Sequence, residues 1–221
     1  MKPSSHVLQP IYAENGSVIF SEILSRFGLA NTQDTILQAE KDGSIVQIDI
    51  ASLEFGRTVN LPVSVNISNK TIESSSREII EKIYPGVIVE ITETYPSQIN
   101  LLELFARNVR LKGCGFALDD VGCGEFSDID WLNFVIKKTS PDWLKLSINS
   151  DDSLISWCLS QKIPIIVEKI ETLWDLRLAI EFGAKGFQGW FFDTQQGVLW
   201  LRKQRNGIEY RVYEKFVLAA A

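Results

Sequence analysis

The segment Phe116-Ala117-Leu118-Asp119-Asp120-Val121 is an apolar run interrupted near its end by two adjacent carboxylates. Its composition predicts a strand, and a strand that is buried on both faces should be almost entirely apolar. Polar residues interrupt similar apolar runs at Asn66, Glu90, Lys145, Glu168 and Gln188. From Asn66 to Gln188, the separations between successive polar residues are 24, 29, 25, 23 and 20 residues, where the second ends at Asp119 and the third starts at Asp120. Each separation is about the length of one strand-helix unit.

Predicted strands alternate with predicted helices from Pro62 onward, so residues 62–192 form repeated strand-helix units. The predicted strands are residues 62–67, 86–92, 116–121, 143–148, 164–170 and 187–192. The predicted helices are residues 70–82, 98–111, 129–138, 151–161 and 172–182. Such units predict parallel strands joined by right-handed crossovers, in an open sheet or a closed barrel. In a barrel, the polar residues at the strand ends converge on one mouth.

The two ends of the chain carry hairpin signals instead. Residues 7–12 and 17–27 flank Asn15-Gly16, which predicts an antiparallel opening pair within residues 1–27. Residues 32–42 and 44–56 are predicted helices, although residues 45–50 alternate like a strand. Residues 198–203 and 208–213 flank Asn206-Gly207, which predicts a C-terminal hairpin within residues 198–216. We find no linker and expect a single domain over residues 1–221, with residues 218–221 interpreted as a vector scar.

Composition excludes several classes of function. The 221 residues are 45% hydrophobic and 23% charged, which is typical of a folded globular protein. The net charge of −6 gives no support for binding nucleic acid or an anionic membrane, and no apolar stretch is long enough to span a membrane. The single histidine, His6, excludes multi-histidine zinc sites. Three cysteines without metal-type spacing favour a reducing compartment, so we expect a cytoplasmic protein.

Carboxylates gathered at one barrel mouth repel each other, and burial adds to the cost, so they require cations. With oxygen ligands and no histidine cluster, the preferred ions are Mg²⁺, Mn²⁺ or Ca²⁺. The adjacent Asp119 and Asp120 suit a two-metal site in which one carboxylate bridges the ions. Lys145 can be interpreted in two ways: its side chain orients a water bound to the metal, or it holds a neighbouring carboxylate in place.

At this point the sequence resembles the EAL family of cyclic di-GMP (c-di-GMP) phosphodiesterases, from about Leu8 to Phe192. The resemblance lies in an ordered set of short motifs, of which any single one is weak. They are Ser21-Glu22-Ile23-Leu24-Ser25-Arg26, Val65-Asn66-Ile67-Ser68, Glu90-Ile91-Thr92-Glu93, Leu118 to Gly124, Lys145-Leu146-Ser147, Val167 to Thr172, and Gln188-Gly189. The family resemblance implies an α/β fold, a modified TIM barrel whose first strand runs antiparallel.

The resemblance also implies roles for individual residues. Two Mg²⁺ or Mn²⁺ ions are expected, the first held by Glu22, Asn66, Glu90 and Asp119 and the second by Asp119, Asp120 and Glu168. Lys145 matches the residue that orients the attacking water and helps to deprotonate it. Glu93 matches a glutamate that steadies the loop after the paired aspartates, which the family links to dimer contact. Gln9, Arg26 and Gln188 match substrate-binding positions. The expected partners are c-di-GMP and a second copy of the chain, and the expected product is linear pGpG.

Departures from the family motifs leave alternatives open. Lys169 stands where the family usually has glycine, and we interpret its side chain as pointing to solvent rather than pairing with an acid. We interpret Trp190, Phe191 and Phe192 as core, with at most one ring able to stack on guanine. One alternative function is a catalytically silent domain that binds c-di-GMP or a protein partner. Another is a Mg²⁺-dependent barrel lyase that uses Lys145 as a base, although the matches at Glu22 and Asn66 count against it.

Overall fold

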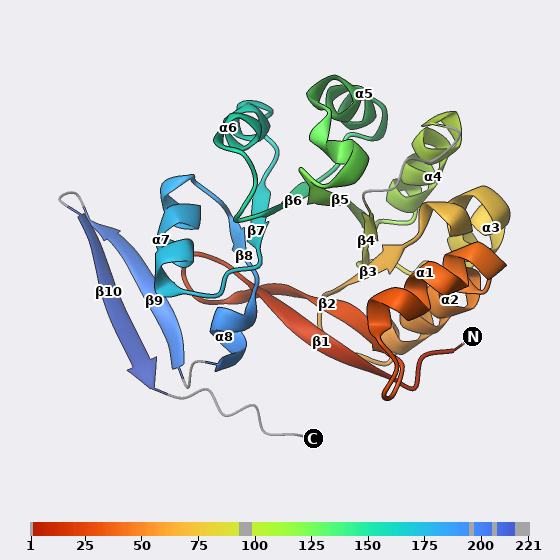
Figure 1. The fold of residues 1–221 in the computed structure, drawn as a ribbon, viewed down its shortest axis with the longest axis horizontal. Helices are drawn as coiled ribbons and strands as arrows, with labels where there is room; N and C mark the ends of the chain where they lie inside the picture. Colours follow the sequence, from red (N-terminus) through yellow and green to blue (C-terminus); the bar gives the residue numbers. More distant parts are fainter. Residues whose placement is uncertain (1, 93–98, 195–196, 205–206, 215–221) are drawn as a thin grey trace.

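The computed structural model describes residues 2–92, 99–194, 197–204 and 207–214. Strands β1 to β8 form a closed barrel in which neighbours follow chain order (Figure 1). The first strand, β1 (Ser5–Tyr12), pairs antiparallel with β2 (Val18–Arg26) and with β8 (Gly186–Phe187). All pairings from β2 to β8 are parallel. The predicted modified TIM barrel with an antiparallel first strand is therefore confirmed.

The intervening elements follow the predicted order. The remaining barrel strands are β3 (Val63–Ile67), β4 (Ile88–Ile91), β5 (Gly115–Val121), β6 (Trp143–Ser147) and β7 (Ile165–Glu168). The helices are α1 (Thr32–Asp42), α2 (Ile45–Gly56), α3 (Asn69–Lys82), α4 (Ile99–Leu111), α5 (Ile129–Thr139), α6 (Asp152–Ser160), α7 (Leu173–Glu181) and α8 (Trp190–Thr194), with a short 3₁₀ helix at Gly124–Ser127. Figure 1 shows α3 to α7 succeeding one another around the outside of the strands.

Side-chain caps fix where several helices begin. Asn31, Ser68 and Asp128 each accept a hydrogen bond from a backbone amide in the first turn of the helix that follows. Thr172 and Asp175 form a reciprocal capping box at the start of α7. These caps set the point at which each chain segment leaves the barrel mouth and turns into its helix.

Residues 45–50, whose alternation resembles a strand, lie within helix α2. This helix buries Ile45, Val46, Ile48 and Ile50, because it packs against helix α3 and strand β3 as well as against helix α1. A helix that is covered on several sides does not need a single apolar stripe. Its sequence therefore lacks the clear helical period that would have excluded a strand.

The prediction of a strand over residues 187–192 is wrong beyond Phe187. Strand β8 has two residues, and helix α8 begins at Trp190. The chain turns at Gly189, and the amide of Phe191 donates to the carbonyl of Ile170 rather than to a neighbouring strand. The aromatic run favours a strand by propensity, but this contact takes the backbone out of the barrel. As a result, Tyr12 and Phe187 are the only pair recorded between β1 and β8 within the described residues.

The predicted C-terminal hairpin is present. Strands β9 (Gly197–Gln204) and β10 (Gly207–Glu214) pair antiparallel as a separate two-stranded sheet, with Gly207 opposite Gln204. The predicted turn residue Asn206, the last two residues of the range 198–216, and the segment 218–221 lie outside the described residues. None of the helices in the described part of the chain combines the length and the apolar composition needed to cross a membrane.

Asp49 lies in helix α2 and is only 4% exposed. Its Oδ2 accepts a hydrogen bond of 3.1 Å from the Ser68 amide. Burial raises the pKa of Asp49 from its ordinary value of 3.8 to about 7, and repulsion from Glu40 adds to the rise. The folded protein thus holds this proton more tightly than the unfolded chain does. Its contribution to stability is therefore greatest at acid pH and falls as the pH rises toward 7.

We expect Asp49→Asn to gain stability relative to the wild type as the pH rises, by roughly 2 kcal/mol between pH 5 and pH 8. The variant carries no ionisable group at this position, so the difference between the two proteins isolates the titration of Asp49. Urea denaturation at pH 5, 6.5 and 8 measures it. A difference that stays constant over this range would mean that Asp49 does not change its charge there.

Candidate metal centre

The polar residues at the strand ends meet at one mouth of the barrel, as the sequence predicts. Glu22 lies on β2, Asn66 on β3, Glu90 on β4, Lys145 on β6 and Glu168 on β7. Asp119 and Asp120 lie on β5, and Gln188 directly follows β8. Register places Asn66 beside Glu90 and places Gln9 of β1 beside Glu22. A cavity of about 280 Å³ opens here, lined by Gln9, Glu22, Asn66, Thr92, Asp119, Asp120, Glu168, Lys169, Gln188, Gly189 and Trp190.

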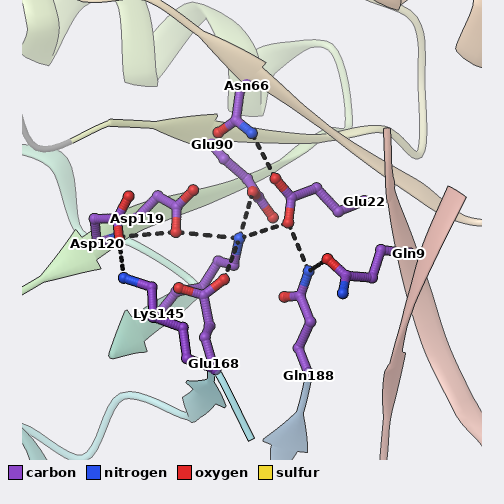
Figure 2. Close-up of polar contacts among 10 residues, drawn as sticks. Gln9, Glu22, Asn66, Glu90, Asp119, Asp120, Lys145, Glu168 and Gln188 are labelled. Atoms are coloured by element: carbon purple, nitrogen blue, oxygen red, sulfur yellow. Dashed lines mark hydrogen bonds and ion pairs between the residues drawn. The ribbon is translucent and has the colours of Figure 1, made fainter. Parts of the chain in front are cut away.

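Lys145 lies at the centre of this group and is fully buried. Its Nζ lies 2.8 Å from Glu90 Oε2, 3.0 Å from Glu168 Oε1, and 3.1 Å from both Glu22 Oε2 and Asp119 Oδ1. Figure 2 shows the four carboxylates pointing toward this ammonium group. A single positive charge cannot neutralise four carboxylates. The buried part of the centre would therefore lack positive charge if all four carboxylates were ionised.

Two amide side chains hold Glu22 in place. Asn66 Nδ2 donates to Glu22 Oε1 at 2.6 Å, and Gln188 Nε2 donates to Glu22 Oε2 at 2.7 Å. Gln188 Nε2 also lies 3.1 Å from Gln9 Oε1 (Figure 2). Because its NH₂ group faces Glu22, the amide of Asn66 leaves its oxygen available for another partner.

Several buried oxygens at this centre lack a partner. Asn66 Oδ1, Glu90 Oε1 and Gln188 Oε1 have no hydrogen-bond partner among the described residues. Leaving a buried oxygen unpaired is costly, so such atoms indicate a missing partner. Carboxylate oxygens of Glu22, Glu90 and Asp119 also lie within 4.8 Å of one another. An all-oxygen donor set with unpaired buried atoms fits a hard divalent cation such as Mg²⁺, Mn²⁺ or Ca²⁺.

The electrostatics of the protein groups at this centre agree with this fit. Burial raises the pKa of Glu90 to about 8 and that of Glu168 to about 7, against the attraction of Lys145. Burial also raises the pKa of Asp119, with repulsion from Glu168 and Glu22 adding to the rise. The surrounding carboxylates outweigh desolvation at Lys145 and hold its pKa well above the ordinary value, so its ammonium group stays charged. Added positive charge would favour the ionised forms of Glu90, Asp119 and Glu168.

Asp120 is paired differently from Asp119. Its Oδ1 lies 3.1 Å from the Nζ of Lys169, which follows Glu168 in the chain. The interpretation that Lys169 points to solvent is therefore wrong, since its ammonium group pairs with an acid at the cavity. The partner lies 49 residues away in sequence, so local pattern carried no sign of the contact.

The remaining predicted residues fall outside this network. Arg26 ends strand β2, where its Nη1 donates to the carbonyl of Ser25 at 3.2 Å, and it is not among the described residues that line the cavity. Glu93 lies outside the described residues. Their assigned roles stay predictions.

Trp190 lines the cavity and is 64% exposed, whereas its neighbour Phe191 is buried in the core. One ring of the aromatic run is therefore exposed at the mouth, in agreement with the interpretation that at most one ring could stack on guanine. In the sequence, only its position directly after Gln188-Gly189 indicated that Trp190 lies near the barrel mouth. Propensity alone assigned it to a strand.

Comparison with known proteins finds similarity at the level of structure. No protein-family model matches the chain, and no curated protein matches its sequence. PaMucR phosphodiesterase in a c-di-GMP complex aligns with a TM-score of 0.71 and 22% identity, over 84% of this chain and 93% of that chain. The FimX EAL domain from Pseudomonas aeruginosa, bound to c-di-GMP, aligns with a TM-score of 0.69 and 16% identity, over 84% and 88% of the two chains.

A third solved structure contains a metal ion. Bacillus subtilis YkuI, a protein with an EAL domain in complex with substrate c-di-GMP and calcium, aligns with a TM-score of 0.68 and 23% identity. The alignment covers 85% of this chain and 53% of YkuI. With its closed eight-stranded barrel and antiparallel first strand, the chain has the fold of EAL-domain structures.

Proposed function

We propose that the protein hydrolyses c-di-GMP to linear pGpG with the help of a divalent cation, Mg²⁺ or Mn²⁺. The observation that carries this proposal is the set of buried carboxylates around Lys145, together with the unpaired oxygens of Asn66 and Glu90. The complexes of PaMucR, FimX and YkuI with c-di-GMP support the choice of ligand. The calcium in the YkuI complex supports a divalent cation.

The residues that would hold the cation are Glu22, Asn66, Glu90 and Asp119. When bound, it supplies Lewis-acid activation of the phosphodiester and of the attacking water. Gln188 and Asn66 keep the Glu22 carboxylate turned toward the centre through their amide groups. Lys145 remains an ammonium donor within the carboxylate group and orients the water for in-line attack at phosphorus. Glu168, whose Oε1 lies 3.0 Å from the Nζ of Lys145, would accept a proton from that water.

A direct assay tests this function. Purified protein with Mn²⁺ should convert c-di-GMP to pGpG, as measured by chromatography, and Glu22→Gln should lose at least about 100-fold in turnover. Glu54→Gln is the matched control, because Glu54 pairs with Lys82 in an exposed salt bridge. Absence of turnover in the wild-type protein with Mn²⁺ or Mg²⁺ would refute the proposed hydrolysis.

A catalytically silent domain that binds c-di-GMP is the second candidate. The pair between Lys169 and Asp120 favours it, since Asp120 is one of the residues predicted to hold a second cation. Nucleotide binding by calorimetry without any pGpG formation would establish this candidate over the first.

Trp190 offers an exposed ring at the edge of the cavity for a guanine base. Stacking of a base on an aromatic ring contributes about 1–3 kcal/mol, so Trp190→Ala should weaken c-di-GMP binding by roughly 5- to 150-fold. Trp174, on helix α7, is exposed to a similar degree and is not among the described residues that line the cavity. Trp174→Ala should leave the affinity unchanged, and equal losses for both variants would contradict a stacking role.

A further inference from the structure

The Lys169 side chain brings a second ammonium group to the mouth of the barrel. Its Nζ lies 3.1 Å from Asp120 Oδ1, while Lys145 occupies the buried side of the same group of carboxylates. The side chains of Lys169 and Asp120 are 52% and 32% exposed, so this pair lies nearer to solvent than Lys145 does. Positive charge is thus already present at the outer carboxylate before any ion binds.

The backbone at this pair adopts a conformation that ordinary residues avoid. Asp120 has φ 48° and Lys169 has φ 60°, both in the left-handed region. Glycine adopts that region without a steric penalty, so a lysine here is less favourable for the backbone than a glycine. Strained residues of this kind cluster at functional sites, where a side chain is needed in one place. At this position the side chain provides a cation for Asp120.

The buried part of the centre contains unpaired oxygens, whereas the outer carboxylate already has a cationic partner. In the buried part, Asn66 Oδ1 and Glu90 Oε1 have no partner within the described residues. Asp120, in contrast, has both the Lys169 ammonium group and the exposure that lets water solvate it. A divalent ion at Asp120 would have to displace Lys169 or approach it against charge repulsion.

We propose that Lys169 fills the place of the second cation, so that the centre binds one divalent ion rather than two. This inference rests on the proposed function, because it assigns the cations within the same centre. It revises the expectation of a two-metal site with Asp119, Asp120 and Glu168 as the second set of ligands. The inner ion is held by carboxylate and amide oxygens, and the ammonium group of Lys169 supplies the outer positive charge.

Titration with Mn²⁺ alone tests the assignment without reference to activity. Calorimetry gives the stoichiometry, and electron paramagnetic resonance distinguishes a single Mn²⁺ from an exchange-coupled pair. Three variants separate charge from backbone: Lys169→Gly removes both the charge and the strained side chain, Lys169→Met removes only the charge, and Lys169→Arg keeps the charge.

The wild-type protein and Lys169→Arg should bind one Mn²⁺ per chain. Lys169→Gly and Lys169→Met should bind a second Mn²⁺ at least tenfold more tightly than the wild type does and show the spectrum of a coupled pair. Two ions bound with equal affinity by all four proteins would overturn the inference while leaving the metal centre intact. A second ion gained by Lys169→Gly but not by Lys169→Met would also overturn it. Absence of Mn²⁺ binding in every protein would instead remove the proposed function, and the inference with it.

Discussion

Changing Lys145 to methionine should lower the free energy of unfolding of the metal-free protein by about 3–5 kcal/mol at pH 8. Lys145 is fully buried, and its ammonium group is the charge that four carboxylates share. Methionine keeps much of the length and apolar character of the lysine side chain, so the loss reports on charge rather than on a cavity. Urea denaturation in the presence of a chelator measures it.

Mn²⁺ should raise the free energy of unfolding of Lys145→Met more than that of the wild type, because a bound cation replaces the lost positive charge. The loss of stability relative to the wild type should also be smaller at pH 5.5, where the carboxylates of Glu90 and Glu168 take up protons. Lys82→Met is the matched control, since Lys82 pairs with Glu54 on the surface, and it should cost less than about 1 kcal/mol. If the two methionine variants lost equal stability, Lys145 would not be the counter-charge of the centre.

Changing Gly189 to alanine should cost more than about 4 kcal/mol or prevent folding altogether. A Cβ at this position would lie 2.2 Å from the carbonyl oxygen of Ile170 and 2.4 Å from its nitrogen. Both atoms belong to the backbone, which cannot move aside as a flexible side chain can. Their displacement would also disturb the hydrogen bonds that Ile170 makes with Gln188 and Phe191. Soluble yield and urea denaturation measure the effect.

Gly183→Ala provides the comparison for Gly189→Ala. Gly183 has φ 88°, so it carries the conformational penalty of a left-handed residue, but nothing lies within 4 Å of the added Cβ. We expect a loss of about 1 kcal/mol there. Similar losses for the two alanine variants would show that the close approach of Gly189 to Ile170 does not determine stability.

The strand-helix order and the convergence of the polar residues could be predicted because both depend on local pattern, whereas the closed barrel was implied by the family resemblance. Each strand is short and apolar, and its one polar interruption lies near the carboxyl end, as at Glu90 and Glu168. Parallel strands bring those ends to a single mouth, so spacing along the chain is enough to group them. The recurrence of a polar residue at six consecutive strand ends carried the prediction of a shared mouth.

The features that could not be predicted depend on contacts between residues that are distant in the sequence. Lys169 was interpreted as solvent-directed, since nothing in its neighbourhood indicates that Asp120 lies 3.1 Å from its Nζ. Residues 188–192 have strand-like composition, but the approach of Gly189 to Ile170 bends the chain into α8. In both cases a tertiary contact overrides the local preference.

The short β8 strand has a consequence for what a ligand does to the barrel. Tyr12 and Phe187 are the one recorded backbone pair at the junction of β1 and β8 in the described residues. Beside that junction, the side chains of Gln9 and Gln188 form the hydrogen bond that faces the cavity. A molecule that engages both amides would tie the first strand to the last. We therefore expect a ligand bound at the mouth to stabilise the closure of the barrel at this junction.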